Sequence, residues 1–237
     1  MVDQEIESIF RFALIEEKFG SSKDIVFGSL QRLKDYLDLF HGSIDEQVKR
    51  EKEGLARLFA SMSQSQREAY MAYHFDDSWY HILTSQFYYS FIIWSFSVFE
   101  DLLAHICRDM KTAAQTPIRW DELRGQNKFD QAHKYFQKLL DFTQPNEDTW
   151  KKLNDSYLIR NVIVHNGGCI VNANKEQHIR KLISEMGHGI SLEQDHLKIT
   201  SEHCHEVIQL LHLFTSAAYL SLDELCDKIV ATRDKTQ

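Results

Sequence analysis

Apolar residues recur at helical spacing along most of the chain, and this pattern predicts a mostly helical protein. Amphipathic periodicity runs through residues 3–19, 22–41 and 43–62, with expected breaks near Gly20 and Gly42. Ser21 or Ser22 and Ser43 are suitable N-caps for the second and third segments. We therefore expect residues 1–77 to form an N-terminal helical extension.

Residues 78–112 predict one long helix that is dense in aromatic side chains. Phe87, Phe91, Trp94, Val98 and Leu102 keep i, i+3, i+4 spacing, as the inner face of a central helix does. An exposed platform for stacking nucleic-acid bases is the alternative, and core packing accounts for the spacing better. We expect Phe91 and Trp94 to be buried against Leu153 or Tyr157.

The rest of the chain continues as helices with one exception. Asn146 is a suitable N-cap for a helix that Asn166-Gly167-Gly168 would end, because an αL residue there is easiest for glycine or asparagine. The stretch "GISLEQDHLKIT" alternates as a short hairpin does, near residues 189–200. The helical segments expected here are 129–143, 146–166, 174–186 and 201–230. The sequence thus predicts an all-α bundle at 78–230 with one small β-hairpin.

Composition limits the class of protein and the compartment that the sequence suits. The net charge of −8 and the pI near 5.8 exclude a strongly basic nucleic-acid coat, although not a local basic pocket. Four cysteines without a C-x-x-C pair suit reduced thiols, and the acidic N-terminus does not resemble a signal peptide. The richest apolar run, residues 87–99, is too short to span a bilayer. We expect a soluble, cytoplasmic protein without a membrane partner.

The candidate functional residues lie in the stretch "SYLIRNVIVHNGG", residues 156–168. On a helix, the apolar side chains of residues 150–165 point in all directions, which indicates burial, yet Arg160, Asn161 and His165 interrupt them. Asn161 and His165 lie at i, i+4, about 6 Å apart along the axis, so the amide can orient the imidazole. The double glycine would leave the ring at an open helix end.

Other familiar signals are missing. The sequence contains no nucleotide-binding glycine loop and no H-E-x-x-H. In "HCHE", residues 203–206, neighbouring side chains point about 100° apart and cannot easily converge on one ion. We therefore expect neither a metal site nor a cofactor.

"RNVIVHNGG" resembles the R-[polar]-x-x-x-H signature of the HEPN superfamily, whose members are α-helical bundles and often RNA-cleaving toxins or defence ribonucleases. The upstream stretches "SVFEDLLAHI" and "WKKLNDSYL" are similar in context, and the resemblance covers roughly residues 78–225. It implies a HEPN-like helical bundle and a metal-independent endoribonuclease that cleaves RNA by attack of the ribose 2′-OH. A toxin or antiviral defence role follows from the same resemblance.

The resemblance also assigns roles to residues. Arg160 would bind the scissile phosphate, His165 would act as general base or acid, and Asn161 would be the orienting polar residue. Glu100 resembles an acidic position near the site in several HEPN groups, with an ion pair or shared water with Arg160 as an equally good structural interpretation. Asn166 is a further supporting candidate.

HEPN ribonucleases typically pair two motif helices across a dimer, so the resemblance implies a homodimer with a composite site. Some HEPN toxins have a tyrosine two residues after the histidine, which a partner enzyme modifies to silence them. Gly167 stands there in this chain, so any antitoxin or regulatory partner would act differently. Two alternatives remain open: a non-catalytic HEPN-fold binding or scaffold protein, and an unrelated helical protein in which Arg160 and His165 form a structural pair.

Overall fold

The computed structural model describes the backbone of residues 2–74, 78–171, 173–187 and 189–234. Side chains are described within these ranges except at 2–19, 21, 73–74, 78–83 and 230–234. The chain divides into two compact units. The first unit contains residues 1–32, 94–159 and 207–237, and the second contains residues 33–93 and 160–206.

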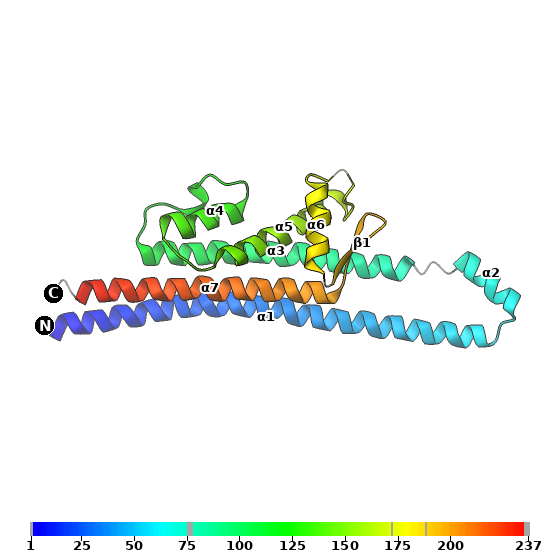
Figure 1. Cartoon of the computed structure of the whole chain (residues 1–237). Helices are drawn as coiled ribbons and strands as arrows, with labels where there is room; N and C mark the ends of the chain where they lie inside the picture. The colour runs from blue at the N-terminus through cyan, green and yellow to red at the C-terminus, as the bar shows by residue number, and fades with distance from the viewer. Residues whose placement is uncertain (1, 75–77, 172, 188, 235–237) are drawn as a thin grey trace. The chain divides into compact units, whose positions relative to one another are not determined.

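The described residues form helices and a single two-stranded antiparallel sheet, as the sequence predicts (Figure 1). In chain order the elements are α1 (Val2–Ala60), α2 (Gln64–His74), α3 (Ser78–Ala114), the 3₁₀ turn η1 (Trp120–Glu122), α4 (Lys128–Lys134), the π-helical segment η2 (Tyr135–Leu139), α5 (Glu147–Asn166), α6 (Glu176–Met186), β1 (Ile190–Glu193), β2 (His196–Ile199) and α7 (Ser201–Asp234).

The predicted breaks near Gly20 and Gly42 are wrong, because α1 runs without interruption from Val2 to Ala60. A glycine inside a helix costs only about 1 kcal/mol relative to alanine, which packing elsewhere along a long helix offsets. Ser43 does not cap a new helix. Its hydroxyl donates to the carbonyl of Leu39 at 2.9 Å, as serine does in a helix interior. Ser22 instead donates to Asp109 at 2.6 Å.

The long aromatic helix is confirmed as α3, but one of its expected core residues is not buried. Phe91 and Leu102 are buried, whereas the Trp94 side chain is 43% exposed, so its predicted burial is wrong. Phe96 is fully buried instead, and its ring centroid lies 5.7 Å from that of Tyr157. The buried side of the helix includes Phe96, Phe99 and Leu103. A core face centred on residue 94 is therefore about half a helical turn away from the observed one.

The later elements match the sequence closely. Asn146 caps α5, since its side-chain oxygen accepts the Thr149 N–H at 2.9 Å. The hairpin lies where alternation predicts it, with Leu192 opposite Leu197. The segment expected as one helix at 129–143 is shorter and divided, because α4 passes into the π-helical turn of η2 and ends at Leu139.

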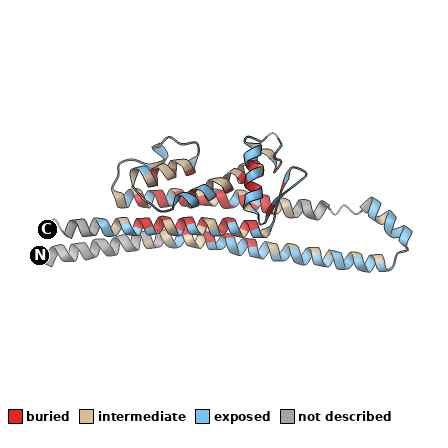
Figure 2. Cartoon of the chain, viewed as in Figure 1, coloured by how far each residue is buried: buried red, intermediate tan, exposed pale blue. Residues whose placement is uncertain are grey.

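The first unit is built around a cluster of aromatic rings. Phe214 of α7 contacts Phe99 of α3 and Trp150 of α5 in edge-to-face geometry, with centroids 5.4 and 4.6 Å apart. Phe129 of α4 stacks on Phe99 at 5.9 Å. These rings are buried and hold α3, α4, α5 and α7 together. In Figure 2, buried residues are coloured red along α3 and α7. Since aromatic side chains contribute the largest buried areas, this cluster is the core of the unit.

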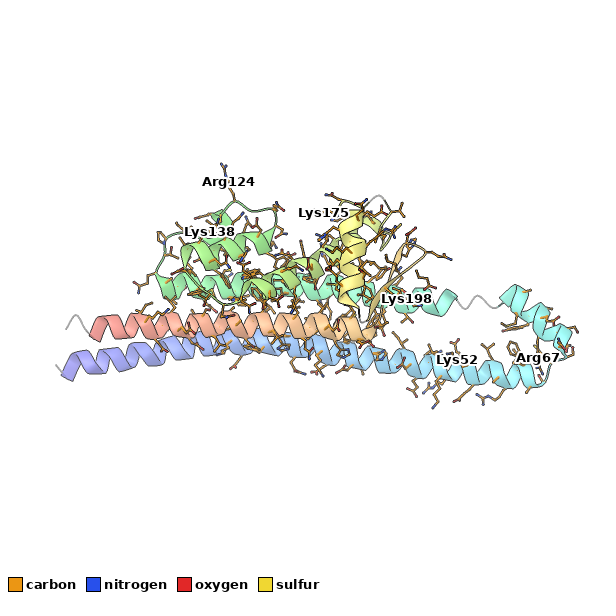
Figure 3. The ribbon with its side chains drawn as sticks, viewed as in Figure 1. Lys52, Arg67, Arg124, Lys138, Lys175 and Lys198 are labelled. Carbon is orange, nitrogen blue, oxygen red and sulfur yellow. The ribbon has the colours of Figure 1, made fainter. Side chains whose placement is uncertain are left out.

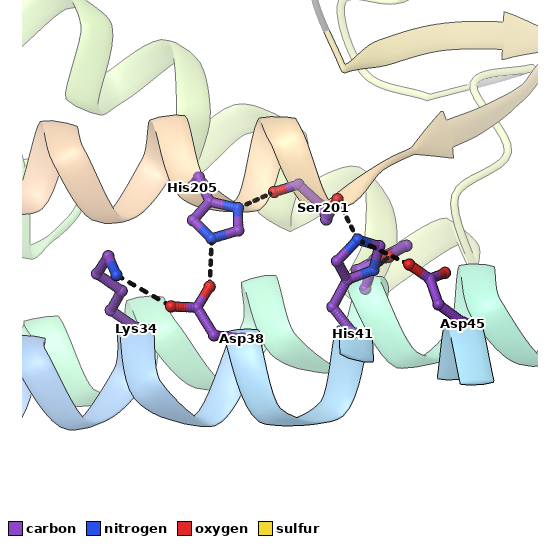
Figure 4. Close-up of polar contacts among 7 residues, drawn as sticks. Lys34, Asp38, His41, Asp45, Ser201 and His205 are labelled. Atoms are coloured by element: carbon purple, nitrogen blue, oxygen red, sulfur yellow. Dashed lines mark hydrogen bonds and ion pairs between the residues drawn. The ribbon is translucent and has the colours of Figure 1, made fainter. Parts of the chain in front are cut away.

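In the second unit, α1 packs antiparallel against both α3 and α7. Tyr36 of α1 stacks on Phe91 of α3, and Tyr88 of α3 bonds to His41 of α1 at 2.9 Å. Figure 4 shows the polar contacts between α1 and α7, where Asp38 binds His205 at 2.7 Å and His41 lies 3.4 Å from Ser201. The predicted division of the chain at residue 77 stays a prediction.

The segment Thr84–Ala114 of α3 is long and apolar enough to cross a membrane, with a mean hydropathy of 1.4 in its most apolar window. Half of that window is buried inside the protein, as in the core helix of a water-soluble fold, so length and composition alone are weak evidence for a membrane span. The expectation of no membrane partner stays a prediction.

Candidate functional site

The predicted polar residues lie on the last two turns of α5, which ends at two glycines in the left-handed region. Gly167 has a φ of +59° and Gly168 a φ of +84°, a conformation that side chains rarely adopt. The Gly167 N–H donates to the carbonyl of Ile163 at 3.0 Å, and the Gly168 N–H donates to that of Val162 at 3.3 Å. These bonds satisfy carbonyls that the helix end would otherwise leave without a donor.

The surface of α5 is more open near this end than the sequence suggests. Burial all round the helix was expected, yet His165 is exposed and Val164 is 41% exposed, while Arg160 and Asn161 are half-buried. The buried face instead carries Ile159, Val162 and Ile163. His165 therefore lies on an open part of the helix surface, whereas Arg160 and Asn161 are half-buried and Nε of Arg160 is enclosed by the protein.

Arg160 and Asn161 form a direct contact. Nη1 of Arg160 donates to the side-chain oxygen of Asn161 at 3.0 Å. Among the described residues, Asn161 makes no hydrogen bond to His165, so the amide orients the guanidinium and not the imidazole. A charged donor accounts for this difference, because hydrogen bonds from ionised groups are stronger than neutral ones.

The two supporting candidates lie in different settings. Asn166 is the last residue of α5, and its carbonyl accepts the Cys169 N–H at 3.0 Å. Glu100 lies in the first unit, where its carboxylate accepts a 2.8 Å hydrogen bond from Lys128. This lysine is an ion-pair partner that local spacing could not reveal, since it is 28 residues away along the chain.

Backbone hydrogen bonds attach the residues after the motif to the hairpin. The carbonyl of Gly168 accepts the Leu197 N–H at 2.9 Å, and the Ile170 N–H donates to the carbonyl of Asp195 at 2.9 Å. The Asp195 carboxylate in turn accepts from Arg180 of α6 at 2.7 Å. The end of α5 is thereby tied through the hairpin to α6.

Histidines of the second unit outside the motif have contrasting surroundings. His205 presents both ring nitrogens to acceptors, the carbonyl of Ser201 and the carboxylate of Asp38, each at 2.7 Å. The pKa of Asp38 is lowered, first by this hydrogen bond and then by that of Lys34. His203 is 3% exposed, and desolvation lowers its pKa to about 4. Sequence spacing gave no sign of the Asp38 contact, which joins residues 167 positions apart.

The described side chains offer no group of three or more His, Cys, Asp or Glu residues placed to hold a metal ion. The expectation that the protein needs no metal or cofactor stays a prediction, because nothing about its reaction follows from that geometry.

Comparisons with protein-family models, with curated proteins and with solved structures each find no match to this chain. The resemblance to the HEPN superfamily therefore rests on the residues of the motif and its neighbouring sequence.

Proposed function

We propose that the chain is a metal-independent endoribonuclease of the HEPN type. The observation that supports this most is the placement of half-buried Arg160 and Asn161 and exposed His165 on the final two turns of α5, immediately before a double glycine. An arginine for phosphate, a histidine for proton transfer and water-accessible space beside them are the groups that 2′-OH attack on RNA needs.

Arg160 would hold the scissile phosphate. Its guanidinium remains charged and can grip two phosphate oxygens, which stabilises the extra negative charge of the pentacoordinate transition state. The bond from Nη1 to Asn161 leaves this fork partly fixed before substrate arrives. A group that is already positioned loses less rotational freedom on binding, so Asn161 supports catalysis through Arg160.

His165 would transfer the proton. Imidazole titrates near neutral pH and can remove the proton from the 2′-OH or give one to the leaving 5′-oxygen. One histidine cannot do both in a single step. We therefore infer a homodimer whose two α5 ends face each other, with one His165 as base and the other as acid. Val164, which is 41% exposed beside His165, would lie in this contact.

RNA binding has modest electrostatic support in the second unit. Lys175 precedes α6 and is exposed, and Lys198 lies on β2, where it also pairs with Glu193 at 3.0 Å (Figure 3). With a net charge of −8, the protein would bind RNA through such local cations and through Arg160. The same acidic charge favours the second candidate, a non-catalytic HEPN-fold scaffold in a defence or regulatory system.

Expression in a bacterial host tests the proposal. Wild type should slow growth and degrade cellular RNA, as expected of a cytoplasmic toxin or defence effector, and His165→Ala should do neither. His178→Ala is the matched control, because His178 is also an exposed helical histidine of the second unit. Equal RNA integrity in all three cultures, with the proteins folded, would favour the scaffold.

Dimerisation has its own test. Analytical ultracentrifugation at micromolar concentration should give a dimer for wild type, and Val164→Asp should weaken it, because a charge at an apolar contact is costly to bury. A strict monomer would contradict the composite site.

A further inference from the structure

We propose that Tyr89 of α3 is a positioning residue for His165, acting through Gly168 and the hairpin. This inference rests on the proposed ribonuclease function, and it identifies a residue outside the motif on which the geometry of that site depends.

The first observation is a close approach between Gly168 and the Tyr89 ring. A Cβ atom at position 168 would lie 2.6 Å from Cε2 and Cζ of Tyr89, and nearer still to the hydroxyl oxygen. Side-chain carbons do not approach at such distances, so only glycine fits against the ring. Gly167, although also left-handed, has no such neighbour within 4 Å of its own Cβ position.

The second observation is a pair of hydrogen bonds that connects Tyr89 to Gly168 through Leu197. The Tyr89 hydroxyl donates to the carbonyl of Leu197, and the Leu197 N–H donates to the carbonyl of Gly168 at 2.9 Å. Tyr89 is 6% exposed, and burial raises its pKa to about 12, so the phenol keeps its proton as a donor. Tyr89, Leu197 of β2 and Gly168 therefore restrict one another's positions.

The hairpin cannot shift freely to follow a displaced helix end. Its turn is fixed to α6, because Arg180 binds the Asp195 carboxylate at 2.7 Å and also bonds to Glu176 at 2.8 and 3.0 Å. The Asp195 carbonyl accepts the Ile170 N–H. Residues 168–170 are thus fixed from two sides, by the Tyr89 ring and by the hairpin turn.

His165 depends on this fixation because its own side chain has no described hydrogen-bond partner. The ring is exposed, and its position follows from the backbone of the last helical turn, which ends at Asn166, two residues before Gly168. A displacement of about 1 Å in a catalytic group can lower a rate by as much as 10²-fold. Loosening the Tyr89 contact should therefore reduce turnover while leaving phosphate binding at Arg160 nearly unchanged.

The test compares Tyr89→Phe with Tyr88→Phe. Both variants remove the phenol hydroxyl of a buried tyrosine of α3, but the Tyr88 hydroxyl interacts with His41 and Ser201 and not with the hairpin carbonyl of Leu197. Tyr89→Phe should lower kcat for RNA cleavage about 10-fold with little change in KM, whereas Tyr88→Phe should stay within about twofold of wild type. Thermal unfolding should change by similar amounts in the two variants.

A second pair of variants, at the two glycines, tests the same contact. Gly168→Ala and Gly167→Ala both place a side chain at a left-handed position, but only the first meets the Tyr89 ring. We expect Gly168→Ala to lower kcat more strongly than Gly167→Ala. If Gly168→Ala does not fold, the tyrosine pair decides the result.

Magnetic resonance separates this inference from the ribonuclease proposal. The imidazole signals of His165, assigned by their loss in His165→Ala, should move in Tyr89→Phe and stay in place in Tyr88→Phe. If wild type fails to cleave RNA, the proposed function is contradicted, and the resonances still decide whether Tyr89 positions the ring. Unmoved signals in Tyr89→Phe, or equal kcat for both tyrosine variants, would overturn the positioning role.

Discussion

Arg160 donates a 3.0 Å hydrogen bond from Nη1 to the side-chain oxygen of Asn161, the next residue along α5. Adjacent helical side chains normally point about 100° apart, and the length of the arginine side chain allows this contact. The polar residue of the R-[polar]-x-x-x-H pattern thereby acquires a structural role, because it helps to hold the guanidinium that we propose binds phosphate.

Substitutions at these two positions should differ in severity. Arg160→Lys should lower the RNA-cleavage rate about 10²-fold or more, because an ammonium lacks the planar fork that binds two phosphate oxygens. Asn161→Ala should be milder, about 10-fold or less, because it removes an orienting bond and no group that contacts the phosphate. Single-turnover kinetics measures both, and an Asn161→Ala defect larger than that of Arg160→Lys would contradict these roles.

The N-cap of α5 gives a prediction about stability. Asn146→Ala removes the acceptor of the Thr149 N–H and should lower the free energy of unfolding by about 1 kcal/mol, the usual effect of losing an N-cap. Urea titration measures this change. Asn174→Ala, at an exposed turn residue, is the control and should leave the urea midpoint unaltered.

His203 should make stability depend on pH. Its pKa falls from 6.5 to about 4 on folding, because burial disfavours the imidazolium. The Glu206 carboxylate, 3.7 Å from Nδ1, is too distant for a hydrogen bond that would offset this cost. Between pH 6.5 and 4 the unfolded chain binds a proton that the folded chain does not, so stability is lost as pH falls through this window.

The measurement for His203 is the difference between wild type and His203→Gln in urea titrations at several pH values. Between pH 6.5 and 4, the free energy of unfolding should fall by up to about 3 kcal/mol more in wild type than in the variant, which corresponds to the shift in the pKa of His203. Parallel pH curves for the two proteins would show that His203 does not stay neutral in the folded protein across this range.

The contact between Asp38 and His205 should change stability in the same direction as His203, but at a lower pH. The pKa of Asp38 is depressed, first by His205 and then by Lys34, so its contribution is present above the unfolded value near 3.8 and is lost as pH falls through the folded value. At pH 7, Asp38→Asn should lower the free energy of unfolding by less than about 1 kcal/mol, with a small fall in melting temperature, since both side chains are partly exposed. The difference should shrink at pH 3, and a constant difference would contradict the ion pair.

Local signals in the sequence predicted the elements that have local causes. Asn146 starts α5, Gly167 and Gly168 end it, and alternation marks the hairpin, because capping bonds, left-handed φ angles and strand periodicity each depend on a few neighbouring residues. The continuity of α1 through Gly20 and Gly42 was not predictable in this way. The cost of a helical glycine is small, and packing far along the chain decides the outcome.

The candidate site was predicted as a set of residues but not as a geometry. Spacing places Arg160, Asn161 and His165 near one another, yet it does not give the Arg160–Asn161 bond or the exposure of His165. The contact of Tyr89 with Gly168 joins residues 79 positions apart, and no local pattern encodes it. Trp94 was misplaced because helical periodicity identifies an apolar stripe without fixing which of its edges faces the core.

The most direct test of the proposed chemistry is the end group of the RNA products formed by purified protein in EDTA. We expect cleavage without added metal, products that carry 2′,3′-cyclic phosphate, and no cleavage where the attacking ribose is 2′-deoxy. His165→Ala should reduce the rate about 10²–10⁴-fold with folding intact, and His178→Ala should leave it unchanged. Cleavage that requires a metal ion, products with 3′-hydroxyl ends, or equal rates for wild type and His165→Ala would contradict the account.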